Sequence, residues 1–428
     1  MQKPFSRRAF IHRSALAASA VALPFPGRVR AAESPGDKII VGVMGVNGRG
    51  TDHARALSGM SNVEIAYLCD VDSRAADKAA KAIGDKVARA PKTVKDFRRI
   101  LDDKNVDALF IATPDHWHAP ATILACAAGK HVYVEKPASF NAREGELAVA
   151  AARKHNRVVQ LGTQRRSYPG VIEAIQKLRE GALGRVLFSR GWYNNARASI
   201  GHGKVGPVPD WLDWELWQGP APDRPFHSNY VHYNWHWFWH WGTGELGNNG
   251  IHSLDICRWG LGVDYPVRVS SGGGKYRHDD DQETPDTHTV TFDFGGKSLA
   301  WEGRSWHPRG VEGSSFGIAF YGEKGTMVID GGNYKIFDFK GAEVDKGSGP
   351  SSDKSHFENF LECIRTGKRP RADIEEGHKS TLLCHLGNIA WRTGHTLNID
   401  PKTGRILDDS AAQALWSREY RPGWEPTV

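Results

Sequence analysis

The sequence is poor in sulfur-containing residues. It has five cysteines and four methionines in 428 residues, and no two cysteines are close enough to form a Cys-x-x-Cys pair. That spacing excludes a zinc ribbon and does not indicate a disulfide framework. We therefore expect most of the thiols to be buried or unpaired. The cysteines are Cys69, Cys126, Cys257, Cys363 and Cys384.

Long apolar runs and an excess of charge are also missing. The apolar run at 15–25 is too short to span a bilayer, and a chain with 40% hydrophobic and 25% charged residues is neither an integral membrane protein nor disordered. The net charge of +7 is misleading because residues 1–31 contain six basic residues and no acid. The rest of the chain is nearly neutral, which gives no case for binding nucleic acid or inserting into a membrane.

The N-terminal 31 residues have the features of an export signal. Arg7 and Arg8 precede Phe10-Ile11, the alanine-rich run follows, and Ala31 ends a plausible cleavage site. The paired arginines resemble a twin-arginine signal, whose export machinery carries folded proteins, often with a cofactor already loaded. We expect residues 1–31 to be this signal and the mature protein to be periplasmic. The alternative is a basic N-terminus without this function.

Residues 37–162 alternate between short apolar runs and helical patterns. We expect strands at 38–44, 63–69, 106–112, 131–134 and 158–161, and helices at 51–57, 74–83, 94–101, 120–128 and 142–155. Asn141 and Glu144 have the spacing of a capping box. Regular alternation of this kind predicts a doubly wound parallel sheet in an α/β fold, the Rossmann type of dinucleotide-binding domain.

The turn after the first strand is rich in glycine. It reads Gly45-Val46-Asn47-Gly48-Arg49-Gly50, which keeps the first and third glycines of the dinucleotide fingerprint and has Asn47 at the second. Asp70 ends the next strand, where a carboxylate can bind a ribose 2′-hydroxyl and would repel a 2′-phosphate. The pattern favours NAD over NADP, although Arg74 is close enough to leave NADP open.

Two later strand ends carry polar side chains. The segment 113–118 follows the third strand, and Glu135-Lys136-Pro137 follows the fourth. Ligands of open parallel sheets bind outside the carboxyl ends of the strands. Both segments should therefore face the cofactor.

The Glu135-Lys136-Pro137 element, after this glycine turn and Thr113-Pro114, resembles the glucose–fructose oxidoreductase/inositol dehydrogenase/rhizopine catabolism family, Gfo/Idh/MocA. The resemblance extends through 161–167 and 244–252 and covers nearly all of the mature chain. It implies a Rossmann domain at 37–162, a C-terminal α/β domain at 163–395 with a large, mostly antiparallel sheet, and an extension at 396–428. In the family that sheet often forms an oligomer contact, so a homo-oligomer is expected.

The resemblance also implies roles for individual residues. Lys136 would be the catalytic lysine beside the nicotinamide, with Glu135 and Gln164 close to that half of the cofactor. The residues expected to bind the cofactor are Gly45, Asn47, Gly48, Arg49, Gly50, Asp70, Thr113, Pro114, His116, Trp117, His118, Glu135 and Gln164. No metal is expected.

The family places an acidic residue four positions before a substrate-facing histidine. Here the histidine is His252, and the position four before it is Asn248. Residues four apart share a helix face, so Asn248 can still bond a substrate hydroxyl, but it cannot accept a proton as a carboxylate would. We expect His252 or Lys136 to handle the proton, with Asn248 orienting the substrate.

The remainder of the chain predicts the second domain. Strands are expected at 186–192, 267–270, 288–294, 298–301, 317–321, 327–329 and 335–339, and helices at 357–364 and 375–393. The turns between the strands are typical of an antiparallel sheet. The second helix is expected to pack back on the body of the protein.

Seven tryptophans fall within 31 residues, between Trp211 and Trp241. Aromatic faces stack on sugar rings, so we expect this stretch to line a carbohydrate cleft. Packing and oligomer contact are the alternatives for any single tryptophan. His232, His236 and His240 have helical spacing and could bind a metal, but no carboxylate or cysteine completes the set. The residues expected to contact substrate are Arg165, Tyr233, Trp235 and His236.

Together these patterns predict a periplasmic oxidoreductase that transfers a hydride between tightly bound NAD and a CH–OH group of a sugar, sugar derivative or glycoside. One alternative is an NAD-dependent glycoside hydrolase that oxidises its substrate transiently, eliminates the leaving group, adds water and returns the hydride. The other is a carbohydrate-binding relative that has lost catalysis.

Overall fold

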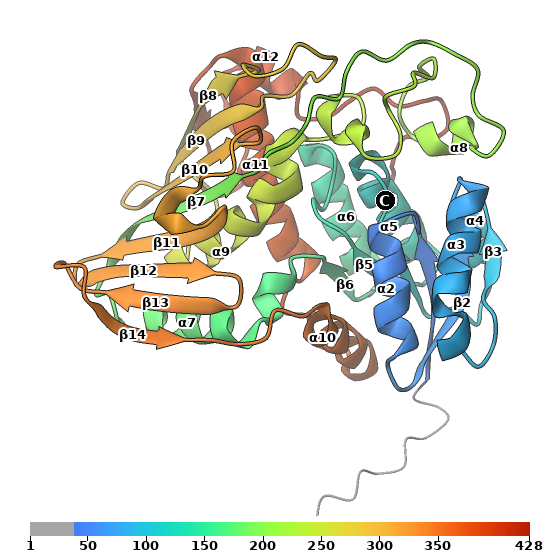
Figure 1. Cartoon of the computed structure of the whole chain (residues 1–428), viewed down its shortest axis with the longest axis horizontal. Helices are drawn as coiled ribbons and strands as arrows, with labels where there is room; N and C mark the ends of the chain where they lie inside the picture. The colour runs from blue at the N-terminus through green and yellow to red at the C-terminus, as the bar shows by residue number, and fades with distance from the viewer. Residues whose placement is uncertain (1–37) are drawn as a thin grey trace, which may run out of the picture. The chain divides into compact units, whose positions relative to one another are not determined.

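The computed structural model describes residues 38–428 of the chain (Figure 1). The twin-arginine signal expected at 1–31 lies outside the described residues and stays a prediction. None of the helices within 38–428 combines the length and the apolar character that a bilayer crossing needs.

The N-terminal part is built on a six-stranded parallel sheet with the order β3-β2-β1-β4-β5-β6. Its strands are β1 (Ile39–Met44), β2 (Val63–Cys69), β3 (Lys92–Val94), β4 (Ala108–Ile111), β5 (His131–Val134) and β6 (Val159–Leu161). The central strands are apolar and almost wholly buried, as expected when helices cover both faces. The predicted doubly wound sheet is confirmed.

Helices cover both faces of this sheet. The connecting helices are α2 (Arg49–Ser58), α3 (Ser73–Ile83), α4 (Arg98–Asp102), α5 (Asp115–Ala127) and α6 (Ala142–Lys154). One hydrophobic core joins α5 and α6 to the sheet, and another joins α2 and α3 to it. Phe357 and Phe360 of α10 (Asp353–Thr366) complete the second core, so a helix from late in the sequence seals the first sheet.

Two helix predictions in this part need correction. The helix expected at 94–101 is shorter: Val94 ends the edge strand β3, and α4 begins only at Arg98. The helix expected from Pro120 begins at Asp115, and Pro120 lies within its second turn. A proline there costs one intrahelical hydrogen bond but leaves the first turn intact.

The capping box at the start of α6 forms only in part. The Asn141 side chain accepts from the Glu144 amide at 2.9 Å, as the spacing predicts. The Glu144 carboxylate accepts from the amide of Phe140 instead of that of Asn141. The second half of the motif is thus shifted by one residue.

The C-terminal part contains a ten-stranded sheet with the order β14-β13-β12-β11-β7-β10-β9-β8-β15-β16. Neighbouring strands are antiparallel except for the parallel pair β7 and β10. This confirms a large, mostly antiparallel sheet. The strands are β7 (Val186–Asn194), β8 (Arg268–Gly274), β9 (Thr287–Asp293), β10 (Ser298–Arg304), β11 (Phe316–Gly322), β12 (Gly325–Asp330), β13 (Asn333–Phe337), β14 (Glu343–Gly347), β15 (Leu397–Ile399) and β16 (Ile406–Leu407).

Three helices share the largest hydrophobic core with this sheet: α7 (Pro169–Arg179), α9 (Ile251–Leu261) and α11 (Ile374–Thr393). The expectation that α11 packs back on the body is confirmed, since its Leu382, Leu383 and Leu386 lie in that core (Figure 1). The short helices α8 (Trp214–Gln218) and α12 (Ser410–Ala414) lie outside the sheet. All five cysteines are buried and free, as expected.

The aromatic stretch forms a core of its own. Trp214 stacks on Trp217 with ring centroids 4.8 Å apart, and Trp241 is wholly buried against both. Phe226, Tyr230, Trp235 and Phe238 belong to the same cluster. Most of these rings therefore pack on one another. Aromatic side chains bury a large apolar surface when they pack together, whereas rings that line an open cleft stay partly exposed.

Candidate functional site

A cavity of about 660 Å³ opens at the carboxyl ends of the parallel strands. Its wall takes residues from the ends of β1, β2, β4 and β5 and from the turn after β6. This is where the strand-end argument places a ligand. Polar groups converge there from segments far apart in sequence, which makes it the candidate active site.

The turn after β1 is shaped to admit a dinucleotide. Gly45 has φ +81°, and a Cβ there would meet the Ala112 carbonyl oxygen at 2.7 Å; a Cβ on Gly50 would collide with the Gly45 carbonyl. Next to Gly48 the space is open. Within the described chain, the amide N–H groups of Asn47 and Gly48 bond no protein acceptor. Free amides at the start of α2 fit a diphosphate.

Asp70 lies in the cavity wall at the end of β2. Its carboxylate accepts from the amides of Val46 and Asp72 at 2.7 and 2.9 Å, while burial raises its pKa. Arg74 turns away: it pairs with Asp72 and stacks 3.5 Å over the Trp211 ring, and it does not line the cavity. This arrangement fits a ribose with a free 2′-hydroxyl and thus NAD.

The segment 113–118 lies along the cavity as the first turn of α5, with one exception. Thr113, Pro114, Trp117 and His118 line the wall. His116, expected to contact the cofactor, is wholly buried away from the cavity and bonds the Trp217 carbonyl at 2.9 Å. In a helical turn successive side chains point in different directions, so not all residues of the segment can face the cavity. In the loop expected from the sequence, all of them could.

Glu135 organises the centre of the cavity floor. Its carboxylate contacts Arg49, His53 and Gln164 at 2.9–3.1 Å. Burial would raise the pKa of Glu135, but Arg49 and His53 hold it well below its usual range. Glu135 therefore stays ionised. Its carboxylate holds Arg49, His53 and Gln164 in place next to Lys136.

Lys136 is the buried cation of the site. Its ammonium group donates to the backbone oxygen of Asn248 at 2.8 Å and to the Asn248 side-chain oxygen at 3.0 Å. Burial lowers the pKa of Lys136, and the charges of Glu135, Asp115 and Glu245 oppose that shift. With two of its three N–H groups on Asn248, one remains for a ligand.

Asn248 lies in a π-helical turn, Leu246–Gly250, that leads into α9. Both Asn248 and His252 line the cavity. Among the described residues, no hydrogen-bond partner contacts either ring nitrogen of His252. Burial and the positive charges of Lys136 and Arg165 hold the His252 pKa well below its usual range. His252 is thus a neutral imidazole whose Nδ1 has no protein partner within the described residues.

The residues expected to contact substrate belong to the same cavity. Arg165, Tyr233, Trp235 and His236 all line the cavity, and Trp217 joins them. The Trp235 and His236 rings stack 3.6 Å apart, and Tyr233 is 50% exposed. Of the seven tryptophans between 211 and 241, Trp217 and Trp235 reach this cavity, which corrects the expectation that the whole stretch lines it.

The three histidines of that stretch do not converge. His232 bonds Asp72, His236 bonds the Tyr233 carbonyl and His240 bonds the Pro222 carbonyl. The chain forms a short 3-10 helix, Asn234–Trp237, so the helical spacing is not realised. Within residues 38–428 no cluster of histidine, cysteine and carboxylate side chains is arranged to hold a metal.

Three carboxylates in or near the site were given no role of their own in the sequence analysis. Asp353 reaches Arg49 at 2.6 Å, Asp115 accepts from the Thr243 hydroxyl at 2.6 Å, and Glu245 pairs with Arg197 at 2.7 Å. Asp115 follows a strand end and could have been found by that rule. Asp353 begins α10 some two hundred residues after β6, and only the folded chain brings it to Arg49.

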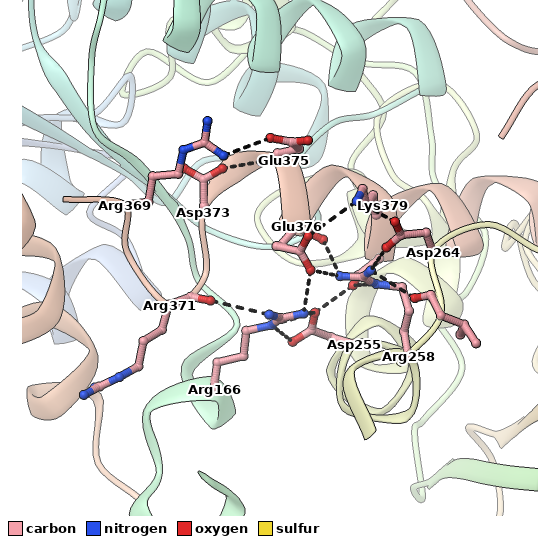
Figure 2. A network of polar contacts seen from close by, with 12 residues as sticks. Arg166, Asp255, Arg258, Asp264, Arg369, Arg371, Asp373, Glu375, Glu376 and Lys379 are labelled. Carbon is pink, nitrogen blue, oxygen red and sulfur yellow. Dashed lines mark hydrogen bonds and ion pairs between the residues drawn. The ribbon is translucent and has the colours of Figure 1, made fainter. Parts of the chain in front are cut away.

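A second group of buried charges lies beside the cavity. Arg166 donates to both carboxylate oxygens of Asp255, and Arg258 and Glu376 extend the set. We call Arg166, Asp255, Arg258 and Glu376 the arginine network; Figure 2 shows its continuous chain of ion pairs. Every charge in it is matched by another side chain of the protein, and none of the four lines the cavity.

Comparison with known proteins agrees with this geometry. Residues 39–163 match the oxidoreductase family profile for an NAD-binding Rossmann fold, and residues 192–426 match the profile for its C-terminal α/β domain. Inositol 2-dehydrogenase of Salmonella typhimurium is 31% identical over 157 residues, 36% of this chain and 46% of the relative. A glycosyl hydrolase family 109 protein of Saccharopolyspora erythraea is 30% identical over 214 residues, 44% and 46% of the two chains.

Each of those two alignments covers about half of the relative's length. Among solved structures, levoglucosan dehydrogenase in complex with NADH and levoglucosan superposes with a TM-score of 0.66 at 18% identity, over 84% of this chain and 99% of that one. That likeness concerns the fold. The second profile alone matches more than half of the chain, and the chain therefore belongs to the Gfo/Idh/MocA oxidoreductase family.

Proposed function

We propose that this protein is an NAD-dependent oxidoreductase that oxidises a ring CH–OH group of a sugar, sugar derivative or glycoside. The observation that carries the proposal is the placement of Lys136, Asn248 and His252 in the wall of a dinucleotide-shaped cavity. The aromatic wall of Trp217 and Trp235 supplies faces on which a sugar ring can stack. The inositol and levoglucosan dehydrogenases among its relatives support this substrate class.

The chemistry divides between the cofactor and the chain. NAD, when bound, supplies the hydride acceptor, and the residues fit it at the glycine turn and at Asp70. His252 accepts the hydroxyl proton, because it lines the cavity and no protein group in the described chain bonds its Nδ1. Lys136 stabilises the developing alkoxide with its remaining N–H group.

Asn248 holds the lysine in place. Two acceptor oxygens of one residue fix the ammonium group, so its third N–H points in a defined direction. Because an amide oxygen carries no formal charge, it orients Lys136 without neutralising it. The full positive charge remains available to the substrate oxygen.

The experiment begins with protein purified from an exporting host. It is denatured, and released nicotinamide nucleotide is quantified by mass spectrometry. Intact protein is then incubated with sugars and aryl glycosides while absorbance at 340 nm and reducing-sugar release are followed together. We expect near-stoichiometric NAD and accumulation of NADH with a keto product. Lys136→Met is the matched control, since it leaves the glycine turn and Asp70 untouched. Absence of bound or bindable nucleotide would overturn the proposal and favour a carbohydrate-binding protein.

A second candidate function is glycoside hydrolysis with NAD used transiently. The observation that favours it is Asn248, an amide at the position where the family carries an acid, together with the similarity to a glycosyl hydrolase family 109 protein. Oxidation beside the acetal would acidify the neighbouring proton, elimination and hydration would follow, and the hydride would return. In the same assay this function releases sugar without net NADH.

We also propose that the protein is exported to the periplasm by the twin-arginine route and assembles as a homo-oligomer. The paired Arg7 and Arg8 before an alanine-rich run support the export proposal. Replacing both arginines by lysine should keep the protein, with its NAD, in the cytoplasm. Light scattering on the mature protein tests the oligomer, and a monomer at micromolar concentration would contradict it.

A further inference from the structure

Arg165 and Arg166 are adjacent in the turn after β6, yet their surroundings differ. Arg166 is 4% exposed and forms a bidentate pair with Asp255. Arg165 has one hydrogen bond, from Nη1 to the Gly331 carbonyl at 3.2 Å, and its guanidinium lies 3.9 Å over the Phe316 ring. In the described part of the chain, no carboxylate is within ion-pair distance of Arg165. Four of its five N–H donors are thus left without a protein acceptor.

An arginine in this condition is costly. Burial lowers the pKa of Arg165, and the charge of Asp330, which lies beyond ion-pair distance, only partly opposes that shift. A buried charge is tolerated when a group of opposite charge pairs with it. Because Arg165 lines the cavity, that partner can be a ligand.

The cofactor is a poor candidate for this partner. Its diphosphate fits the amides of Asn47 and Gly48 at the turn after β1, whereas Arg165 follows β6. In the sheet order β1-β4-β5-β6 these turns start three strand spacings apart, about 14 Å. Arg165 belongs instead with Lys136 and His252, since its charge acts on the His252 imidazole. It therefore faces the part of the cavity where the substrate reacts.

Three other cations line the cavity: Lys95, Arg49 and Lys136. Lys95 follows β3, at the opposite edge of the sheet from the turn that carries Arg165. Arg49 pairs with Glu135 and Asp353, and Lys136 donates to Asn248. A single free guanidinium fork has the geometry of a carboxylate, and a phosphate dianion would call for a second free cation. The ligand group that fits is therefore a single carboxylate.

We propose that Arg165 forms an anion subsite and that the substrate is an acidic sugar whose carboxylate pairs with this guanidinium. The inference rests on the proposed function and deepens it by naming the substrate class. It distinguishes this cavity from one built for a neutral polyol, which would leave the guanidinium unpaired.

Equilibrium binding tests the subsite without requiring turnover. Calorimetry on the NAD-loaded protein compares glucuronate, galacturonate and gluconate with glucose and galactose, and with glucose 6-phosphate, at equal ionic strength. At least one acid should bind tenfold or more tightly than its neutral counterpart. In Arg165→Met that acid should bind about 100-fold more weakly than in the wild type, the size expected when one partner of a desolvated charge pair is removed. Arg165→Lys should retain part of the preference, because it keeps the charge and loses the fork.

Arg74→Met is the matched control for loss of one positive charge. Arg74 pairs with Asp72 outside the cavity, so its removal should leave the preference for acids in place. Thermal melting of each variant shows whether it is folded. The inference is overturned if no acid binds more tightly than its neutral counterpart, if the preference survives in Arg165→Met, or if the phosphate ester binds more tightly than every carboxylate.

Turnover separates this failure from failure of the proposed function. If neutral sugars yield NADH and no acid is preferred, the oxidoreductase stands and the subsite does not. If no sugar yields NADH but an acid binds through Arg165, the subsite stands and the oxidoreductase does not. With both correct, kcat/KM for the acid falls about 100-fold in Arg165→Met, mainly through KM, and by less than tenfold for the neutral sugar.

Discussion

The arginine network and the cavity contain the same kinds of buried charge in opposite states. In the network Arg166, Asp255, Arg258 and Glu376 pair with one another (Figure 2). In the cavity Lys136 is held by a neutral amide, and Arg165 has no carboxylate within reach in the described chain. A buried charge that pairs with another side chain of the protein helps to hold the fold in place. A buried charge without such a partner is available to a ligand. The difference separates residues that support the site from residues that act in it.

Removing the cavity cation should produce the largest effect. Lys136→Met should lower kcat/KM by 10³-fold or more, because the alkoxide loses its positioned charge. The midpoint of thermal unfolding should stay close to that of the wild type or rise, since a desolvated charge has been removed. Absorbance at 340 nm and a melting curve measure both. If the variant is less stable but keeps its specific activity, Lys136 supports the fold, as the residues of the arginine network do, and does not act in the reaction.

Removing a network cation should have the reverse pattern. Arg166→Met leaves Asp255 buried and unpaired, which should cost about 3 kcal/mol in the free energy of unfolding. The double variant Arg166→Met/Asp255→Leu should recover most of that loss. Urea unfolding measures each value. Specific activity of the folded fraction should stay within about threefold, and a loss like that of Lys136→Met would end the distinction between the two clusters.

Placing a carboxylate beside Lys136 should sharpen the comparison. In Asn248→Asp the new charge lies where the amide oxygen is 3.0 Å from the ammonium group, so it opposes the lowering of the lysine pKa by burial. The alkaline limb of the pH profile of kcat/KM reflects loss of the Lys136 proton. It should move to higher pH by about one unit, a tenfold gain in rate above the wild-type limb. If Lys136 were the base, it would act only in its unprotonated form, so the acid limb and not the alkaline limb would move to higher pH.

The smallest effect should come from removing Arg74, an exposed cation that pairs with the buried Asp72. Arg74 lies at the surface beside Asp72 and over Trp211. Arg74→Ala should change the free energy of unfolding by less than about 1 kcal/mol and the preference for NAD over NADP by less than about threefold. Competition binding with the two cofactors checks this. A large swing in preference would mean that Arg74, and not Asp70, selects the cofactor.

Much of the first domain could be predicted because its strands are short, apolar and buried on both faces. The strands 63–69 and 131–134 match β2 and β5 residue for residue. Edges were less predictable: β3 is partly exposed and carries no apolar pattern. The helices α7 and α9 were also not predicted from the sequence. For α9 the reason is that most of its surface is buried, so its sequence shows no amphipathic stripe.

The candidate site divides in the same way. Lys136, Asn248 and His252 were identified from motifs and do share one wall. His116 was placed wrongly, since α5 begins earlier than its proline suggested and turns that side chain toward Trp217. Most of the tryptophans proved to be core, because composition alone cannot separate a ring that packs on its neighbours from one that faces a ligand.

The sequence by itself determined the family and the dinucleotide turn and pointed to Lys136, since these depend on residue types at short, fixed spacings. The tertiary structure alone decided which charges are matched. Arg165 and Arg166 are the same residue type in adjacent positions, and nothing local tells them apart. The partners that distinguish them lie in α9 and α11, far along the chain, and burial makes the presence or absence of such a partner decide between support of the fold and binding of a substrate.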